Sequence, residues 1–184
     1  MEEPLIQIVE HNGKLTAKWQ QEGFEMELKA SLDPYAGLND LDHLGRVLCK
    51  IEVRRDSTPG VQNEYLRSIK RFYVPNVSCS DLQREYEEEG FSTSESKKKA
   101  TEQINADMER VCAFMREEWG MMCFLVDASF QGIVLGIGSL SGVEDDSGME
   151  YFLQVTEELA REAIADARKA IAKIKTFDLE IKEG

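Results

Sequence analysis

Residues 121–137, MMCFLVDASFQGIVLGI, decide the fold class of this chain. The runs 121–126 and 133–137 are almost wholly apolar, and a segment that contains Asp, Ser, Gln and Gly joins them. Short runs that are apolar on both faces are typical of strands in the centre of a sheet. We therefore expect two central strands here. The glycine-rich stretch 136–142 is interpreted as a strand end followed by a flexible loop.

Helical patterns flank this strand pair. A long helix is predicted over 95–119, with Gly120 as its terminator, because its apolar residues recur every three or four positions. That stripe comprises Ile104, Met108, Val111, Cys112, Met115 and Trp119. A second helix is predicted over 157–175 with Thr156 as its N-cap, after a short strand at 151–153. A short acidic helix is expected to begin at a Ser80–Gln83 capping box and to end at Gly90.

The first third of the chain is predicted to form strands. Asn12-Gly13 suits a two-residue hairpin turn between strands at 5–9 and 15–19. Apolar and charged residues alternate over 24–28, which indicates a half-buried strand. Alternation over 46–54 and a run over 65–74 favour a further hairpin.

These patterns together predict an α+β fold. We expect a single layer of mainly antiparallel sheet, with about six to eight strands, packed against two longer amphipathic helices. The length of 184 residues favours one compact domain over 1–184, with a subdivision near 76–96 as the alternative.

Charge is the strongest compositional signal. The chain carries 35 acidic and 22 basic residues, a net charge of −13. A field of that sign disfavours nucleic acid and anionic membranes and favours a basic protein partner. Residues 46–75 reverse the balance, with seven bases against three acids. No apolar run approaches the roughly 20 residues that span a bilayer, and the acidic start lacks a hydrophobic signal segment, so a cytoplasmic location is expected.

No motif predicts a metal site or a cofactor. The four cysteines, Cys49, Cys79, Cys112 and Cys123, are widely separated and form no C-x-x-C pair. We expect all four to remain reduced thiols. The glycine-rich stretch does not match a nucleotide-binding loop, and it runs into acidic residues that would repel phosphate. A homo-oligomer is compatible with the sequence.

The leading functional hypothesis is a non-catalytic acidic binding protein. Its partner-binding surface is predicted to comprise Glu85, Glu87, Glu88, Glu89, Glu144, Asp145 and Asp146. In one version the protein inhibits a basic nucleic-acid-binding protein or enzyme by occupying its groove, as small acidic phage proteins do to restriction and CRISPR enzymes. That analogy rests on charge and size alone. An intracellular adaptor or chaperone is the plainer version.

Two further hypotheses remain open. Residues 46–75 could form a nucleic-acid-binding hairpin, in which arginines contact phosphates and tyrosines stack on bases. Its candidate residues are Arg54, Arg55, Tyr65, Arg67, Lys70, Arg71 and Tyr73, with Tyr65, Arg67, Arg71 and Tyr73 on one face. Alternatively, the basic residues of this hairpin could form ion pairs with the acidic helix of the same chain. An enzyme assembled from scattered residues such as Asp127, His43 and Glu150 is the weakest hypothesis.

Overall fold

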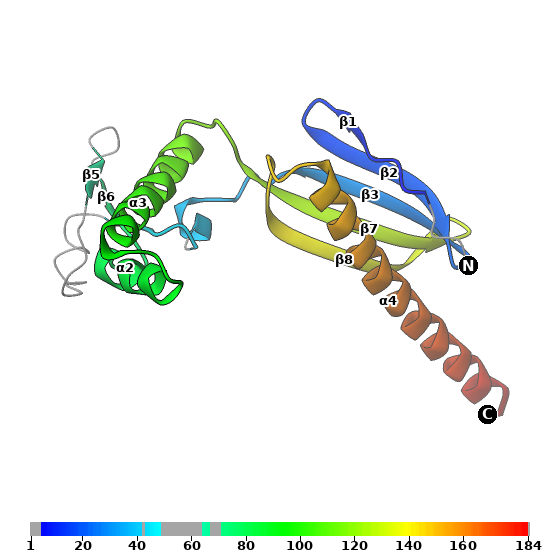
Figure 1. Cartoon of the computed structure of the whole chain (residues 1–184). Coiled ribbons are helices and arrows are strands. Elements are labelled where there is room, and N and C mark those ends of the chain that lie inside the picture. Colours follow the sequence, from blue (N-terminus) through cyan, green and yellow to red (C-terminus); the bar gives the residue numbers. More distant parts are fainter. Residues whose placement is uncertain (1–4, 42, 49–63, 67–70, 184) are drawn as a thin grey trace. The chain divides into compact units, whose positions relative to one another are not determined.

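The structure is a computed structural model, and it describes residues 5–41, 43–48, 64–66 and 71–183 (Figure 1). The strands are β1 (Val9–His11), β2 (Lys14–Gln21), β3 (Phe24–Leu32), β4 (Arg46–Leu48), β5 (Glu64–Leu66), β6 (Arg71–Val74), β7 (Met121–Phe130) and β8 (Ile133–Glu144). The α-helices are α2 (Cys79–Glu88), α3 (Thr93–Met115) and α4 (Met149–Glu183), and a 3-10 helix, η1, covers Leu38–Leu41.

The chain divides into two compact units. Unit 1 comprises Met1–Pro34 and Gly120–Gly184, and unit 2 comprises Tyr35–Trp119. The boundaries therefore lie on both sides of one long insertion and not near 76–96. A single domain over the whole chain stays a prediction.

Unit 1 contains an antiparallel sheet of five strands in the order β1-β2-β3-β7-β8. The predicted Asn12-Gly13 turn is confirmed, because both residues have positive φ and His11 pairs directly with Lys14. Gln131-Gly132 joins β7 to β8 by the same geometry, with φ of 51° and 77°. Such turns match the right-handed twist of the strands that they connect.

Both strands of the β7–β8 pair are longer than the sequence predicted. β7 lies inside the sheet, as expected, but β8 is an edge strand. The glycine-rich stretch 136–142 is not a loop, since it lies wholly within β8. The flexible-loop interpretation was wrong because Gly136 and Gly138 pack against the backbone of α4.

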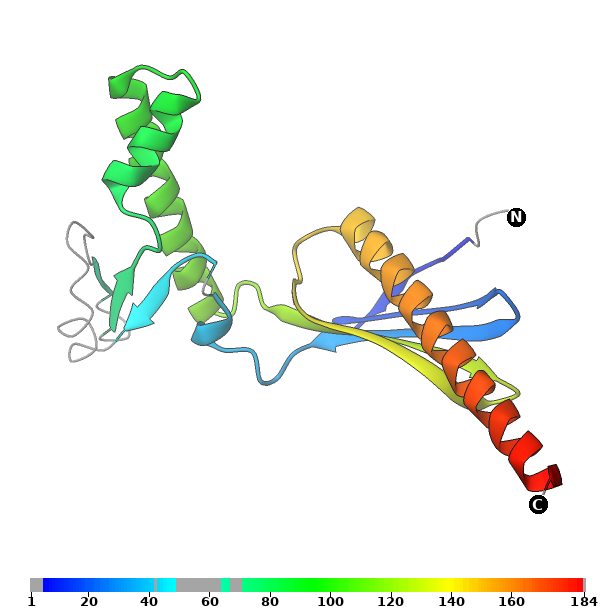
Figure 2. The ribbon, with the colours of Figure 1, turned by 90° about the horizontal axis from the view of Figure 1, so that it is seen from below.

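α4 covers one face of this sheet (Figure 2). A Cβ atom on Gly136 would lie 2.0 Å from the backbone oxygen of Ala163, and one on Gly138 would lie 2.3 Å from that of Leu159. The helix backbone thus rests directly on β8, where only glycine fits. The buried core between α4 and the sheet is formed by Leu15, Ala17, Trp19, Phe24, Met26, Leu28, Ala30, Met122, Phe124, Val126, Ala128, Val143, Phe152, Val155, Leu159, Ala160, Ala163, Ile164 and Ala167.

α4 begins earlier than predicted. It starts at Met149, so 151–153 is helical and not a strand. Thr156 is a buried residue inside the helix, where its hydroxyl donates to the backbone oxygen of Phe152 at 2.7 Å, and it is not an N-cap. The C-terminal part of α4 extends past the strands, and residues 172–176 are exposed (Figures 1 and 2). Among the described residues, no helix is both long and apolar enough to cross a membrane.

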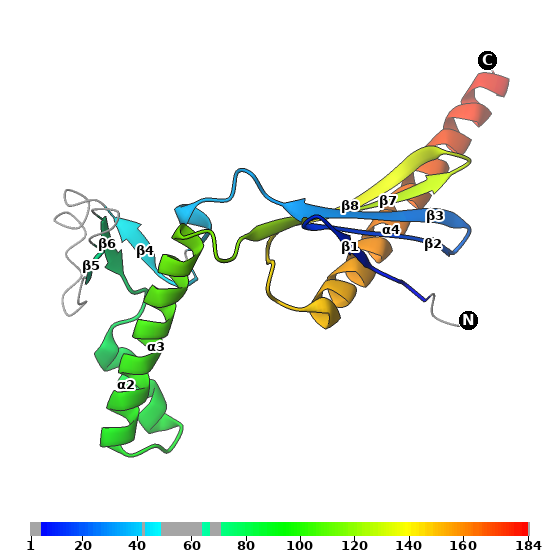
Figure 3. The same cartoon turned by 90° about the horizontal axis from the view of Figure 1, so that it is seen from above.

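Unit 2 contains a three-stranded antiparallel sheet in the order β4-β6-β5 and a hairpin of α2 and α3 (Figure 3). β4 is described only as far as Leu48, so the rest of the predicted 46–54 strand lies outside the described residues. The predicted run 65–74 contains two strands that both belong to this sheet, β5 and β6, with the segment between them outside the described residues.

The helix caps of unit 2 correct two further predictions. α2 is capped by Ser78 and not by Ser80, since the Ser78 hydroxyl accepts from the backbone N–H of Asp81. α3 begins at Thr93, two residues before the predicted start at 95, with a capping box formed by Ser92 and Glu95. The helix ends at Met115, before Trp119 and Gly120.

The α+β class is thus confirmed, although the main sheet has five strands and not six to eight. The two long helices lie in different units. α4 packs on the five-stranded sheet, and α3 packs along α2.

Candidate partner-binding surface

The C-terminal end of α2 carries the densest negative charge among the predicted site residues. We call Glu85, Glu87, Glu88 and Glu89 the acidic turn of α2. All four side chains are exposed, and Glu89 is the C-cap. Gly90, with φ of 98°, ends the helix, and its N–H donates to the Glu87 backbone oxygen at 3.0 Å. Glycine is favoured at this position because it adopts positive φ without strain.

No cation neutralises the acidic turn among the described residues. The only basic residue of α2, Arg84, forms an ion pair with Asp81 at 3.0 Å in the first turn of the helix. The last turn contains no basic residue. Glu87 accepts a hydrogen bond from the Gln83 amide at 2.9 Å, which leaves its charge in place.

One lysine of α3, Lys99, is engaged by aromatic rings at the tip of the helical hairpin. The Lys99 ammonium lies 4.2 Å from the ring centroid of Phe91 and 5.5 Å from that of Tyr86. These two rings contact each other edge to face at 6.1 Å. Cation–π contacts of this kind hold Lys99 against the tip of the helical hairpin.

The second predicted acidic group lies in unit 1, where Glu144 is the last residue of β8 and Asp145 and Asp146 follow it before α4. The predicted acidic surface therefore draws its residues from both units. Asp145 lines a small cavity of about 150 Å³ together with Glu10, Leu15, Met122 and others. Its Oδ1 is buried, and no described residue donates a hydrogen bond to it.

Among the residues predicted for the nucleic-acid-binding face, Tyr73 is buried. Tyr73 is only 1% exposed, and its hydroxyl donates to the Leu44 backbone oxygen at 2.7 Å, so its ring cannot stack on a base. Burial, reinforced by the charge of Asp107, raises the pKa of Tyr73. The strand register places Tyr65 opposite Phe72, and Glu64 opposite Tyr73. Arg71 is exposed, and Arg54, Arg55, Arg67 and Lys70 lie outside the described residues.

A charged network covers the face of the five-stranded sheet that points away from α4. Lys29 lies between Glu27, at 2.9 Å, and Asp127, at 3.0 Å, and Lys18 pairs with Glu27 at 3.0 Å. Hydrogen bonds from Lys29 and Lys18 hold the pKa of Glu27 below its usual value, and the same carboxylates raise the pKa of Lys29. These charges neutralise one another across neighbouring strands.

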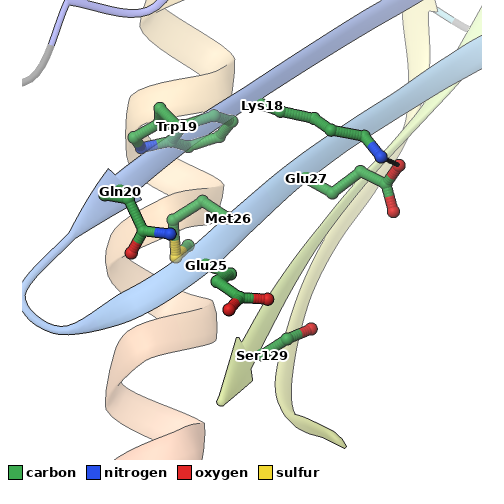
Figure 4. Close-up of a pocket in the computed structure, with 7 residues that line it drawn as sticks. All are labelled: Lys18, Trp19, Gln20, Glu25, Met26, Glu27 and Ser129. Carbon is green, nitrogen blue, oxygen red and sulfur yellow. Dashed lines mark ion pairs between the residues drawn. The ribbon is translucent and has the colours of Figure 1, made fainter. Parts of the chain in front are cut away.

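The network borders an open groove of about 410 Å³ that also includes Gln20, Glu25 and Ser129 (Figure 4). Figure 4 shows Lys18 and Glu27 reaching toward each other from β2 and β3. Nucleophilic catalysis would need a base beside Ser129, and no described residue hydrogen-bonds to its hydroxyl.

Two residues of the enzyme hypothesis, Asp127 and Glu150, belong to different elements of unit 1. Asp127 is paired with Lys29 on the sheet face opposite α4, whereas Glu150 lies exposed in the first turn of α4. His43 belongs to unit 2. Within the described part of the chain, no cluster of three or more His, Cys, Asp or Glu side chains could hold a metal ion. Cys79, Cys112 and Cys123 are free thiols.

Comparison with known proteins found no match to a family model, to a curated protein or to a solved structure.

Proposed function

We propose that the protein is a non-catalytic binding protein that engages a basic protein partner through the acidic turn of α2. The observation that carries this proposal is the position of the four glutamates. They occupy the end of a helix at which negative charge is least favourable, and no described cation compensates them.

Two electrostatic costs act on the acidic turn. The C-terminus of a helix carries a partial negative charge, so each anion there costs a few tenths of a kcal/mol to about 1 kcal/mol. Glu85 and Glu88 are three positions apart and Glu85 and Glu89 four, which places like charges side by side on the helix surface. Lysine or arginine in any of these positions would favour the isolated helix. A partner that supplies cations would remove both costs on binding.

We further propose that the partner is a nucleic-acid-binding protein or enzyme that the chain inhibits. Such a partner presents lysines and arginines to phosphates, and the acidic turn offers carboxylates to the same groups. The net charge of −13 would accelerate the encounter, and added salt would slow it. The burial of Tyr73 favours this proposal over direct binding of nucleic acid.

Affinity capture from a lysate of the source cells tests the proposal. The tagged wild-type chain is compared with a variant that carries Glu87→Lys, Glu88→Lys and Glu89→Lys. The matched control carries Glu157→Lys, Glu158→Lys and Glu162→Lys, which changes the net charge equally at exposed positions of α4. We expect a basic nucleic-acid-binding protein to be retained by the wild type and the control, to be lost with the α2 variant, and to elute as salt rises.

Two outcomes would contradict the proposal. Equal loss with both variants would mean that total charge, and not the acidic turn, governs retention. Recovery of nucleic acid in place of a basic protein, with no effect of the α2 variant, would support the nucleic-acid-binding alternative. In that case Arg71→Glu should reduce the recovery of nucleic acid.

A further inference from the structure

β8 is an edge strand without the usual protection of an edge. It pairs with β7 on one side, and no other described strand pairs with its outer side. Natural sheets guard long edges with charged side chains, proline or short strand length. β1, at the other edge, has only three residues and includes Glu10 and His11. β8 has 12 residues.

The composition of β8 is unusual for this chain. Residues 133–143, IVLGIGSLSGV, contain no charged residue, although 31% of the chain is charged. Several of its large apolar side chains are exposed: Ile133 64%, Val134 48%, Ile137 50% and Leu140 41%. In most soluble proteins such a strand would be covered.

α4 packs on one face of β8, and no backbone hydrogen bond joins the described part of the helix to residues 133–143. The helix backbone rests on the face that carries Gly136 and Gly138, where a Cβ atom would meet backbone atoms of α4. Ile137 and Ser139 alternate with these glycines and are exposed. The pairing of β8 with β7 has irregularities near Cys123 and near Leu135, but it is regular from Gly136 to Leu140. That segment therefore has a regular pairing with β7 on one side and an edge without a described strand partner on the other.

We propose that β8 pairs antiparallel with β8 of a second copy of this chain, across a two-fold axis, to form a continuous ten-stranded sheet. Two-fold dimers use the same patch on both subunits, and a strand paired with itself about such an axis is antiparallel. Among the described strands, β8 is the long one that has both an open edge and an uncharged segment, 133–143, so a second β8 is the partner that fits it best.

The distribution of charge on this chain favours a second copy, and not the basic partner, as the occupant of the β8 edge. Two chains of net charge −13 repel each other over most of their surface, and an uncharged strand is the place where they can approach. A basic partner is attracted instead to carboxylates, which this segment lacks. The dimer therefore does not depend on the proposed function, and added salt should strengthen it while weakening the complex with a basic partner.

Sedimentation of the full chain tests the dimer. The wild type should sediment at twice the chain mass of 20.9 kDa. Ser139→Glu places like charges near each other across the two-fold axis, and it should weaken the dimer at least tenfold. Thr16→Glu is the matched control, since it adds the same charge at an exposed position of β2, an interior strand of the same sheet. This control should remain dimeric.

Amide hydrogen exchange locates the interface. Raising the protein concentration should slow exchange within 133–144 and leave β1 unchanged. A wild-type chain that is monomeric at about 100 μM, equal sedimentation of the two variants, or concentration-dependent protection elsewhere than β8 would each overturn the proposal. Circular dichroism of Ser139→Glu confirms that the variant remains folded, so that a loss of dimer is not a loss of fold.

Discussion

At the scale of single residues, the glycines of β8 show how packing overrides local propensity. Glycine weakens an isolated strand, so the sequence favoured a loop over 136–142. The strand forms because the backbone of α4 packs directly on it, which leaves no room for a side chain at Gly136 or Gly138. The helix residue that contacts Gly136, Ala163, lies almost 30 residues further along the chain. No local pattern contains that information.

We predict that Gly136→Ala destabilises unit 1. The added methyl group would lie 2.0 Å from the Ala163 oxygen and 2.4 Å from the Ala167 nitrogen, both of which are backbone atoms that cannot rotate away. Displacing the helix should cost at least about 2 kcal/mol of unfolding free energy, measured by urea denaturation. Ser139→Ala, on the exposed face of the same strand, should change it by less than about 0.5 kcal/mol. Equal effects would contradict the close packing.

Lys29 provides a second residue-scale prediction, with a dependence on pH. Lys29→Met removes the cation shared by Glu27 and Asp127, and Asp127 is only 8% exposed. Since Lys29 itself is half exposed, we expect the substitution to lower the unfolding free energy by about 1 kcal/mol near pH 7.

The direction of the pH dependence follows from Glu27. The pKa of Glu27 in the folded state lies below its usual value. The ion pairs of Glu27 therefore contribute fully to the unfolding free energy at a pH above the usual pKa, and this contribution is lost as pH falls through the folded-state pKa. The difference between wild type and Lys29→Met should therefore shrink below about pH 4. A difference that stays constant from pH 7 to pH 3 would show that lost packing, and not charge, causes the effect.

At the scale of elements, the helix boundaries show where local signals compete. Ser78 and Ser80 are both good N-caps, and the structure selects Ser78, which also bonds to the Ser80 hydroxyl at 2.8 Å and to the Asp81 carboxylate at 2.6 Å. Thr156 resembled a cap, but it lies in the second turn of a helix that begins at Met149. The periodic apolar stripe of 159–171 correctly predicted a helix. The residues before it, 151–153, were predicted to form a strand, but they belong to the same helix.

The acidic turn of α2 makes an element-scale prediction about stability. The variant Glu87→Lys, Glu88→Lys, Glu89→Lys should raise the unfolding free energy of unit 2 by about 1 kcal/mol at low salt, because it reverses unfavourable charges at a helix C-terminus. The gain should diminish in 1 M salt, where screening is strong. Hydrogen exchange in α2 measures this locally. A loss of stability would show that the glutamates make structural contacts that favour the fold.

At the scale of the whole molecule, the sequence could indicate the α+β class but not the division into units. Every pattern used to predict strands and helices spans fewer than about 20 residues. Unit 1 depends instead on the pairing of β3 with β7, in which Leu32 lies opposite Met122. The acidic residues that were predicted to form one surface likewise lie in both units. Tyr73, which was predicted to contact nucleic acid from the basic hairpin, is buried.

This topology predicts that unit 1 folds without the insertion. The Asp33 N–H donates to the Met121 oxygen at 2.7 Å, so the two ends of the insertion already lie side by side. Replacing 34–120 with Asn-Gly should convert β3 and β7 into a hairpin. The shortened chain should retain the strand and helix signals of unit 1 and unfold cooperatively by circular dichroism. A chain without cooperative unfolding would show that unit 1 depends on the insertion for its stability.

The most direct test of the proposed function is zero-length cross-linking of carboxylates to lysines in a lysate of the source cells. A carbodiimide joins only groups in direct contact, and mass spectrometry identifies the linked residues. We predict that glutamates of the acidic turn of α2 are linked to lysines of a basic nucleic-acid-binding protein, and that these links are lost in high salt. Links found only at carboxylates elsewhere in the chain, with Glu85, Glu87, Glu88 and Glu89 unmodified by any partner, would contradict the proposal.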